Sequence, residues 1–126
     1  MTETELKRRT KEFAIRILKL VDSFPETRSA RIVANQLGRA GTSVGANYRS
    51  ACRSRSASEM MSKLAIVEEE ADESAFWLEV AGDVRVVAPT RLADLAREAG
   101  ELTAIMVASR RTLALRNRKS RFENRK

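Results

Sequence analysis

Apolar residues recur at alternating intervals of four and three along four stretches of the chain, which is the spacing of one face of an α-helix. The first stretch covers about residues 3–24, and Thr2 and Glu5 have the spacing of a capping box at its start. Pro25 ends this stretch, because proline cannot continue a helix. The second stretch begins just after it and loses its pattern at the polar run 53–55. The inner faces predicted for these two helices are Leu6, Thr10, Phe13, Ile17, Leu20 and Phe24, and then Val33, Leu37, Ala40, Val44 and Tyr48 or Ala51.

The third and fourth stretches have similar boundary signals. Ser56 and Glu59 form a second capping-box pattern, and Gly82 is predicted to close the third helix. Pro89 announces the fourth helix, and the run 84–87 between the two could by itself form a strand. The predicted inner rows are Met61, Leu64, Glu68, Ala71, Ala75 and Leu78 for the third helix, and Leu92, Leu95, Ala99, Leu102, Met106, Ser109 and Leu113, in heptad register, for the fourth.

Length and composition support an all-α fold. A chain of 126 residues is long enough for one domain with one modest core. Short connections make consecutive helices antiparallel, so the predicted fold is an antiparallel up-down-up-down four-helix bundle. We expect the bundle to span residues 1–115 and residues 116–126 to form a basic C-terminal tail, as a frayed helix end or a flexible segment.

Three glycines interrupt the second helical pattern. Gly38, Gly41 and Gly45 lie with Ala34 on one stripe of the helix. Each glycine costs a helix interior about 0.8–1 kcal/mol relative to alanine, so a missing side chain must be needed there. We predict that the stripe is a seam where another helix approaches closely. A phosphate cradle is the alternative, although neither the Walker signature nor the dinucleotide-binding fingerprint is present.

The residue inventory disfavours most enzyme classes. The chain has no histidine, which removes the commonest general base and the usual metal ligand. Its single cysteine, Cys52, has arginines nearby that could lower a thiol pKa, although a buried and inert residue is the simpler interpretation. No enzymatic activity, cofactor or metal is therefore expected. No apolar run reaches 18 residues and no leader is visible, so we expect a cytoplasmic protein without a membrane partner.

The third helix is acidic, whereas the rest of the chain is basic. Residues 58–83 contain one lysine and eight acids, although the whole chain has a formal charge of +7. Carboxylates four apart, such as Glu69 and Glu73, repel each other unless cations lie beside them. We expect structural ion pairs in which Arg39 and Arg53 contact Glu69 or Asp72. A metal site is the alternative, but the di-iron pattern needs histidine.

A second apolar row on the third helix does not fit a self-contained bundle. Phe76, Trp77 and Val80 lie off the inner face, and exposed aromatic residues usually mark a partner surface. We predict that these three residues form an oligomer interface. An irregular bundle that buries both rows is the alternative.

Basic residues near the two chain ends could contact nucleic acid. The first helix starts at the end of an antiparallel bundle where the fourth finishes, so cations from both should meet on one rim. Such a rim would attract phosphates without reading sequence, whereas a solvated helix end is the alternative. The predicted nucleic-acid-binding residues are Lys7, Arg8, Arg9, Arg116, Arg118, Lys119 and Arg121.

The central part of the chain resembles a known family. Residues 41–56, residues 63–74 and the motif Phe76-Trp77-Leu78-Glu79 together resemble the bacterial four-helix bundle family named after the protein encoded in 23S ribosomal RNA intervening sequences. The resemblance covers Gln36 to Ala81, and this chain has Tyr48-Arg49-Ser50 where many members have Ala-Glu-Gly. It implies an antiparallel bundle, commonly a ring-like homopentamer, with no established enzymatic activity. A more distant relative, the accessory protein of diversity-generating retroelements, is a basic pentamer that binds nucleic acid and a reverse transcriptase.

Two functions follow as hypotheses. The first is a homo-oligomeric, pentameric bundle that binds RNA or DNA as an accessory to another protein. The second is a protein interaction scaffold in which the charges only pair subunits. Salt-dependent binding to nucleic acid would distinguish them.

Overall fold

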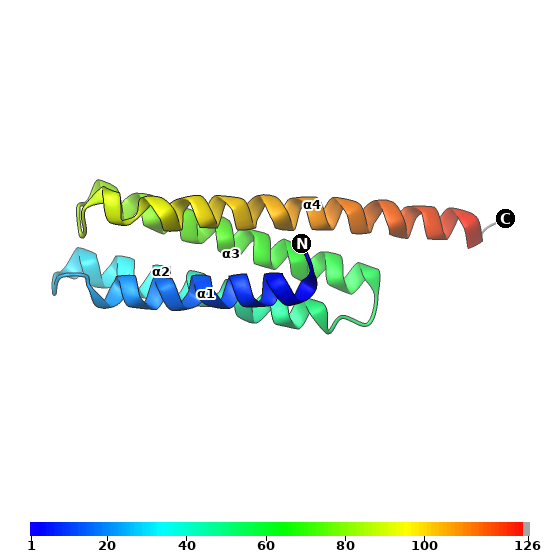
Figure 1. The fold of residues 1–126 in the computed structure, drawn as a ribbon, viewed down its shortest axis with the longest axis horizontal. Coiled ribbons are helices and arrows are strands. Elements are labelled where there is room, and N and C mark those ends of the chain that lie inside the picture. Colours follow the sequence, from blue (N-terminus) through cyan, green and yellow to red (C-terminus); the bar gives the residue numbers. More distant parts are fainter. Residues whose placement is uncertain (125–126) are drawn as a thin grey trace.

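The chain forms four long helices joined by short connections, as seen in a computed structural model that describes residues 1–124 (Figure 1). Consecutive helices run in opposite directions, and the described part of the chain contains no strand. The prediction of an all-α, antiparallel four-helix bundle is confirmed. The helices are α1 (Glu3–Asp22), α2 (Arg28–Cys52), α3 (Ala57–Asp83) and α4 (Ala93–Asn124), and the short 3-10 helix η1 (Pro89–Arg91) precedes α4.

Side-chain caps fix the starts of the first three helices. The Thr2 hydroxyl accepts a hydrogen bond from the Glu5 N–H, and the Glu5 carboxylate accepts one from the Thr2 N–H, so the first capping box is complete. The second is half formed. Ser56 caps α3 by accepting from the Glu59 N–H, but the Glu59 carboxylate accepts from the Arg55 N–H instead. Thr27 caps α2 through the Ala30 N–H.

The core follows the predicted inner faces in α1 and α2 but not in α3. Phe13, Ile17 and Leu37 are fully buried, as their spacing predicts. In α3 the buried residues are Leu64, Val67, Ala71, Ser74, Leu78 and Ala81, whereas Met61, Glu68 and Ala75 of the predicted row are only half-buried. The predicted row for α3 is therefore partly wrong. The reason is that α3 packs extensively against both α2 and α4, so its buried face lies between the two apolar rows.

The turn after α3 replaces the possible strand at residues 84–87. The Arg85 N–H donates to the Gly82 carbonyl and the Val86 N–H to the Ala81 carbonyl, which is the Schellman pattern of a helix end. Arg85 has a φ of 58°, so an arginine holds the left-handed position that glycine usually takes. Because Val86 and Val87 are buried against the bundle, this apolar run anchors a turn rather than forming a strand.

The fourth helix is longer than its neighbours. Its 32 residues span about 48 Å at 1.5 Å per residue, whereas the 20 residues of α1 span about 30 Å. The C-terminal turns of α4 consequently project past the other helices (Figure 1). Every described residue beyond Ala114 except Asn117 is exposed. The basic segment predicted as a tail is thus helical over residues 116–124, and Arg125 and Lys126 lie outside the described residues.

Candidate nucleic-acid interface

One end of the bundle collects the cations. At this end α1 begins, α2 ends, α3 begins and α4 finishes (Figure 1). The three segments there, residues 1–12, 46–63 and 108–124, hold 14 of the 24 lysines and arginines but only 5 of the 17 acids. Arg116 lines one cavity together with Met1 and Leu6, so this α4 cation lies beside the start of α1.

Intramolecular ion pairs occupy the α1 cations at this end. Lys7 contacts Glu3 at 3.1 Å, and Arg8 contacts Glu12 at 3.0 Å; both pairs are exposed and join residues four apart on one helix. Exposed pairs of this kind stabilise a helix by only about 0.3–0.5 kcal/mol, so a phosphate group can displace the carboxylate. Lys7 and Arg8 consequently remain accessible to a polyanion.

Arg9 is held more firmly than its neighbours. Its Nε and Nη2 donate to the two Glu98 carboxylate oxygens at 2.7 and 2.5 Å, and Nη2 also contacts Glu101. The Arg9 and Glu98 side chains are only 20% and 14% exposed. The hydrogen bonds from Arg9 hold the pKa of Glu98 below its usual value, and those from Glu98 raise the pKa of Arg9. Arg9 therefore joins α1 to α4 and is much less accessible than the sequence predicted.

The α4 cations at this end have no such partners. The side chains of Arg116, Arg118, Lys119 and Arg121 are exposed, and none of them forms an ion pair within residues 1–124. Glu123 is the only acid in residues 116–124. The projecting end of α4 is thus a cationic surface with little internal neutralisation, and the exposed aromatic side chain of Phe122 lies on it.

Two of the three glycines on the α2 stripe lie where α1 approaches closely. A Cβ on Gly41 would lie 2.8 Å from the Ile17 Cγ1, and one on Gly45 would lie 3.2 Å from the Thr10 carbonyl oxygen. Both glycines are buried in this packing seam, and they lie in the interior of α2, where backbone N–H groups bond within the helix and do not form a phosphate-binding loop. Gly38 differs, because a Cβ there would meet nothing within 4 Å, so its assignment to the seam is wrong.

Arginine pairs join the acidic helix to its neighbours, but through carboxylates other than those predicted. Arg39 of α2 contacts Glu70 at 3.2 Å and Glu73 at 2.5 Å. Its hydrogen bond holds the pKa of Glu73 below the usual value. The assignment of Glu69 and Asp72 to these pairs is wrong, since both are exposed and have no ion pair in the described part of the chain.

The geometry of a helix explains the difference. Residues three apart, such as Glu70 and Glu73, share the face of α3 that lies toward Arg39. Arg53 likewise forms no ion pair within residues 1–124, because α2 has ended there. Sequence reasoning also missed the Arg110–Glu68 pair at 2.5 Å, which joins α4 to α3. The sequence did contain an indication of this pair, because Glu68 lies on the predicted inner row of the third helix and an acid that faces a neighbouring helix needs a cation there.

The predicted oligomer residues differ in their exposure. Trp77 and Val80 are half-buried and pack against the core, as the irregular-bundle alternative expects. Phe76 is 53% exposed, and its ring meets the Trp77 ring edge-on with centroids 5.0 Å apart. The buried Trp77 Nε1 has no partner at full hydrogen-bond geometry in residues 1–124, but it helps to lower the pKa of the Glu73 carboxylate and is therefore not isolated from acceptors. The exposed Phe76 ring is the feature of this face that a partner could cover.

Cys52 and the acidic residues offer little chemistry in the described part of the chain. Burial raises the pKa of the half-buried Cys52 thiol, which agrees with the inert interpretation. Residues 1–124 contain no group of three or more Cys, Asp or Glu side chains that could hold a metal ion. Among the same residues, no helix has the length and apolar character needed to cross a membrane.

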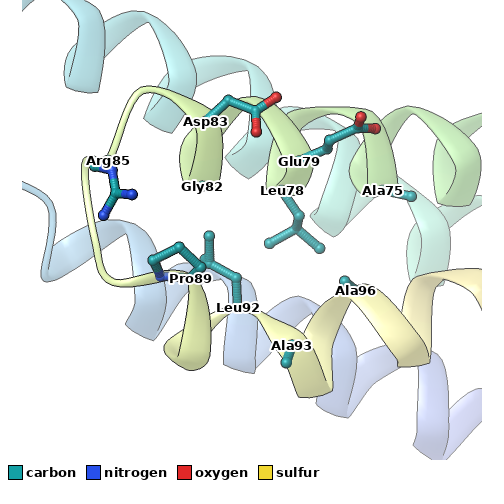
Figure 2. Close-up of a pocket in the computed structure, with 10 residues that line it drawn as sticks. All are labelled: Ala75, Leu78, Glu79, Gly82, Asp83, Arg85, Pro89, Leu92, Ala93 and Ala96. Atoms are coloured by element: carbon teal, nitrogen blue, oxygen red, sulfur yellow. The ribbon is translucent and has the colours of Figure 1, made fainter.

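A cavity of about 630 Å³ lies at the opposite end of the bundle, between the end of α3 and the start of α4 (Figure 2). Leu78 of α3 and Leu92, the residue between η1 and α4, extend into it, whereas the Glu79 and Asp83 carboxylates lie along its α3 side (Figure 2). Arg85 is the one cation among its lining residues. The two carboxylates make this cavity unfavourable for a phosphate group, so any nucleic-acid contact belongs at the other end.

Four antiparallel helices around one apolar core, with a cationic end and an acidic third helix, define a basic four-helix bundle protein. The model of the 23S rRNA-intervening sequence protein family matches residues 2–108, and the chain belongs to this family. A crystal structure from Bacteroides thetaiotaomicron, described as a protein with unknown function from the S23 ribosomal protein family, is similar to it. The TM-score is 0.76 at 27% identity, covering 82% of this chain and 95% of the other. No curated protein matches the chain.

Proposed function

We propose that this protein is a cytoplasmic, non-enzymatic homo-oligomer, a pentamer as the family resemblance implies, that binds RNA or DNA as an accessory to another protein. The observation that carries the proposal is the projecting end of α4, where Arg116, Arg118, Lys119 and Arg121 are exposed and have no ion pair within residues 1–124. Like charges gathered on one helix end repel each other, and a polyanion removes this repulsion while releasing its own counterions.

Oligomerisation would strengthen such a surface. A ring of subunits repeats the cationic end in every copy, so weak contacts to one nucleic-acid chain add through their effective concentration. Support for self-association comes from the exposed Phe76 ring on the acidic helix. A neighbouring subunit could cover this ring.

The scaffold hypothesis remains the second candidate because of a specific observation. Glu69, Asp72 and Glu79 are exposed on α3 and have no ion pair in the described residues, so they could receive the α4 cations of another copy. In that case the charges would hold subunits together and nucleic acid would compete with assembly.

A salt titration distinguishes these functions. Deleting residues 116–126 should leave the melting temperature unchanged and remove only the helical signal of the deleted turns, because the described part of this segment lies beyond the core. The deletion should weaken binding to single-stranded and double-stranded RNA and DNA, and it should flatten the dependence of log K on log salt. Unchanged affinity and slope, or no binding by the intact protein at ~50 mM salt, would leave the scaffold function.

A further inference from the structure

A second cationic feature lies in the groove between α1 and α2, on the side of their shared seam. A cavity of about 540 Å³ opens there between Lys7 and Lys11 of α1 and Arg49 of α2. Its floor consists of small residues, among them Ala14, Gly45 and Ala46, and no acidic residue lines it. The cavity thus has three cationic side chains around it and no carboxylate inside it.

The groove is a consequence of the glycine seam. Because Gly45 has no side chain, the α2 backbone comes so close to α1 that a Cβ there would lie 3.2 Å from the Thr10 carbonyl oxygen. Ala14 and Ala46 beside it contribute only methyl groups. Longer side chains at these places would fill the space, so the same small residues that bring the helices together leave a recess between the cations.

The charges around the groove are poorly neutralised. Neither Lys11 nor Arg49 forms an ion pair with any other residue of the 1–124 range. Lys7 contacts only Glu3, in an exposed pair within α1. Arg49 also lines a neighbouring cavity of about 350 Å³ together with Ser50 and Arg53, which extends the row of cations toward the end of α2.

Structural roles explain only part of this arrangement. Arg49 lies in the last turn of α2, where a cation complements the helix dipole. Lys7 and Lys11, in contrast, are four apart on one helix, a placement at which like charges destabilise the helix by a few tenths of a kcal/mol. The addition of Arg49 across the groove increases this repulsion. An anion bound between these three cations would replace their mutual repulsion with attraction to the anion.

We infer that the groove between α1 and α2 binds phosphate groups in the backbone of a nucleic acid, as a contact site separate from the end of α4. The inference rests on the proposed function and adds to it a place on the protein where the sugar-phosphate backbone of the nucleic acid binds. Lysine and arginine with no base-stacking aromatic side chain in the groove contact phosphates without reading sequence. The residues that line the groove belong to the first half of α1 and the second half of α2, toward the end of the bundle past which α4 projects (Figure 1).

The test compares two double variants that remove the same charges from the same helices. The groove variant is Lys11→Gln with Arg49→Gln, and the control is Lys19→Gln with Arg28→Gln, which are exposed residues at the other end of the bundle. The probe is a fluorescein-labelled oligouridylate titrated over a range of salt concentrations. Two lost phosphate contacts should lower the slope of log K against log salt by about 1.4 and the affinity at ~0.1 M salt roughly 10- to 30-fold.

The control variant should bind within about threefold of the unmodified protein, since distant charges are screened at ~0.1 M salt. Circular dichroism melting should show that both variants are folded. Equal losses in the two variants would overturn the inference, because only net charge would then matter. If the groove variant binds like the unmodified protein while deletion of residues 116–126 abolishes binding, the proposed function stands and the groove is not part of it. Absence of binding by the unmodified protein would overturn both.

Discussion

At the scale of single residues, the glycines of α2 show how one missing side chain determines the packing of two helices. Gly38, Gly41 and Gly45 look alike in sequence, since all lie on one helical stripe. In the structure a Cβ would meet α1 at Gly41 and Gly45, whereas one at Gly38 would meet open space. Glycine is therefore required at two positions and merely tolerated at the third.

Leucine substitutions should distinguish the glycine that the packing requires from the glycine that the helix only tolerates. Gly45→Leu should destabilise the protein by about 1–3 kcal/mol or more, because its side chain would force the Thr10 backbone away. Gly38→Leu should leave stability unchanged or raise it by up to about 0.8 kcal/mol, since leucine favours the helix and the space is open. Chemical denaturation followed by circular dichroism measures both. Similar midpoints for the two variants would show that Gly45 is not in a seam.

At the scale of elements, the four helix pairs are held together in two ways. The α1–α2 pair uses the glycine seam, whereas each of the other three neighbouring pairs has an arginine bound to carboxylates: Arg39 between α2 and α3, Arg110 between α3 and α4, and Arg9 between α1 and α4. The α1–α4 pair makes the fewest contacts of the four, so its ion pair carries the largest share of that interface.

Replacing Arg9 should therefore affect stability more than replacing its neighbour Arg8. Arg9→Met leaves the nearly buried Glu98 carboxylate without its main partner and should cost about 1.5–3 kcal/mol, as expected for a hydrogen bond to a charged group. Arg8→Met removes an exposed pair within α1 and should cost less than about 0.5 kcal/mol. Urea denaturation at neutral pH measures the difference. Equal costs would indicate that the Arg9 fork contributes no more than a surface pair.

The pH dependence provides a second check on this pair. Arg9 lowers the pKa of Glu98 in the folded protein, so the pair's stabilisation is fully present above the unfolded pKa of about 4.3. It is lost as the pH falls through the lower folded value, because Glu98 is then protonated. The stability gap between the unmodified protein and Arg9→Met should narrow below pH ~4.3. A gap that stays constant down to pH ~2 would contradict this assignment.

At the scale of the whole molecule, the exposed Phe76 ring predicts association between copies. Light scattering should give a mass well above the 14.1 kDa of one chain at micromolar concentration. Phe76→Glu should shift this mass toward the monomer without loss of helicity, since the ring lies outside the core. Ile32→Glu, an exposed apolar residue of α2, is the matched control and should leave the mass unchanged. A monomeric mass for the unmodified protein would rule out this interface.

The sequence by itself determined the number of helices, their caps and the inner faces of α1 and α2, because periodicity and capping are local properties of the chain. The family was also recognisable from residues that are close together in sequence. That the cations of α1 and α4 gather toward one end followed from topology alone, since α1 starts at the end of the bundle past which α4 projects (Figure 1).

Only the tertiary structure decided which residues of the same kind are buried and which charged residues form ion pairs. The face that α3 buries depends on its two neighbours together, so Val67 and Ser74 are buried although Glu68 lay on the predicted row. Arg9 is bound, because a carboxylate from α4 reaches it, whereas no acid among residues 1–124 forms an ion pair with Arg116. Local rules cannot rank residues of the same kind, since their partners come from helices far along the chain and are set by packing in three dimensions.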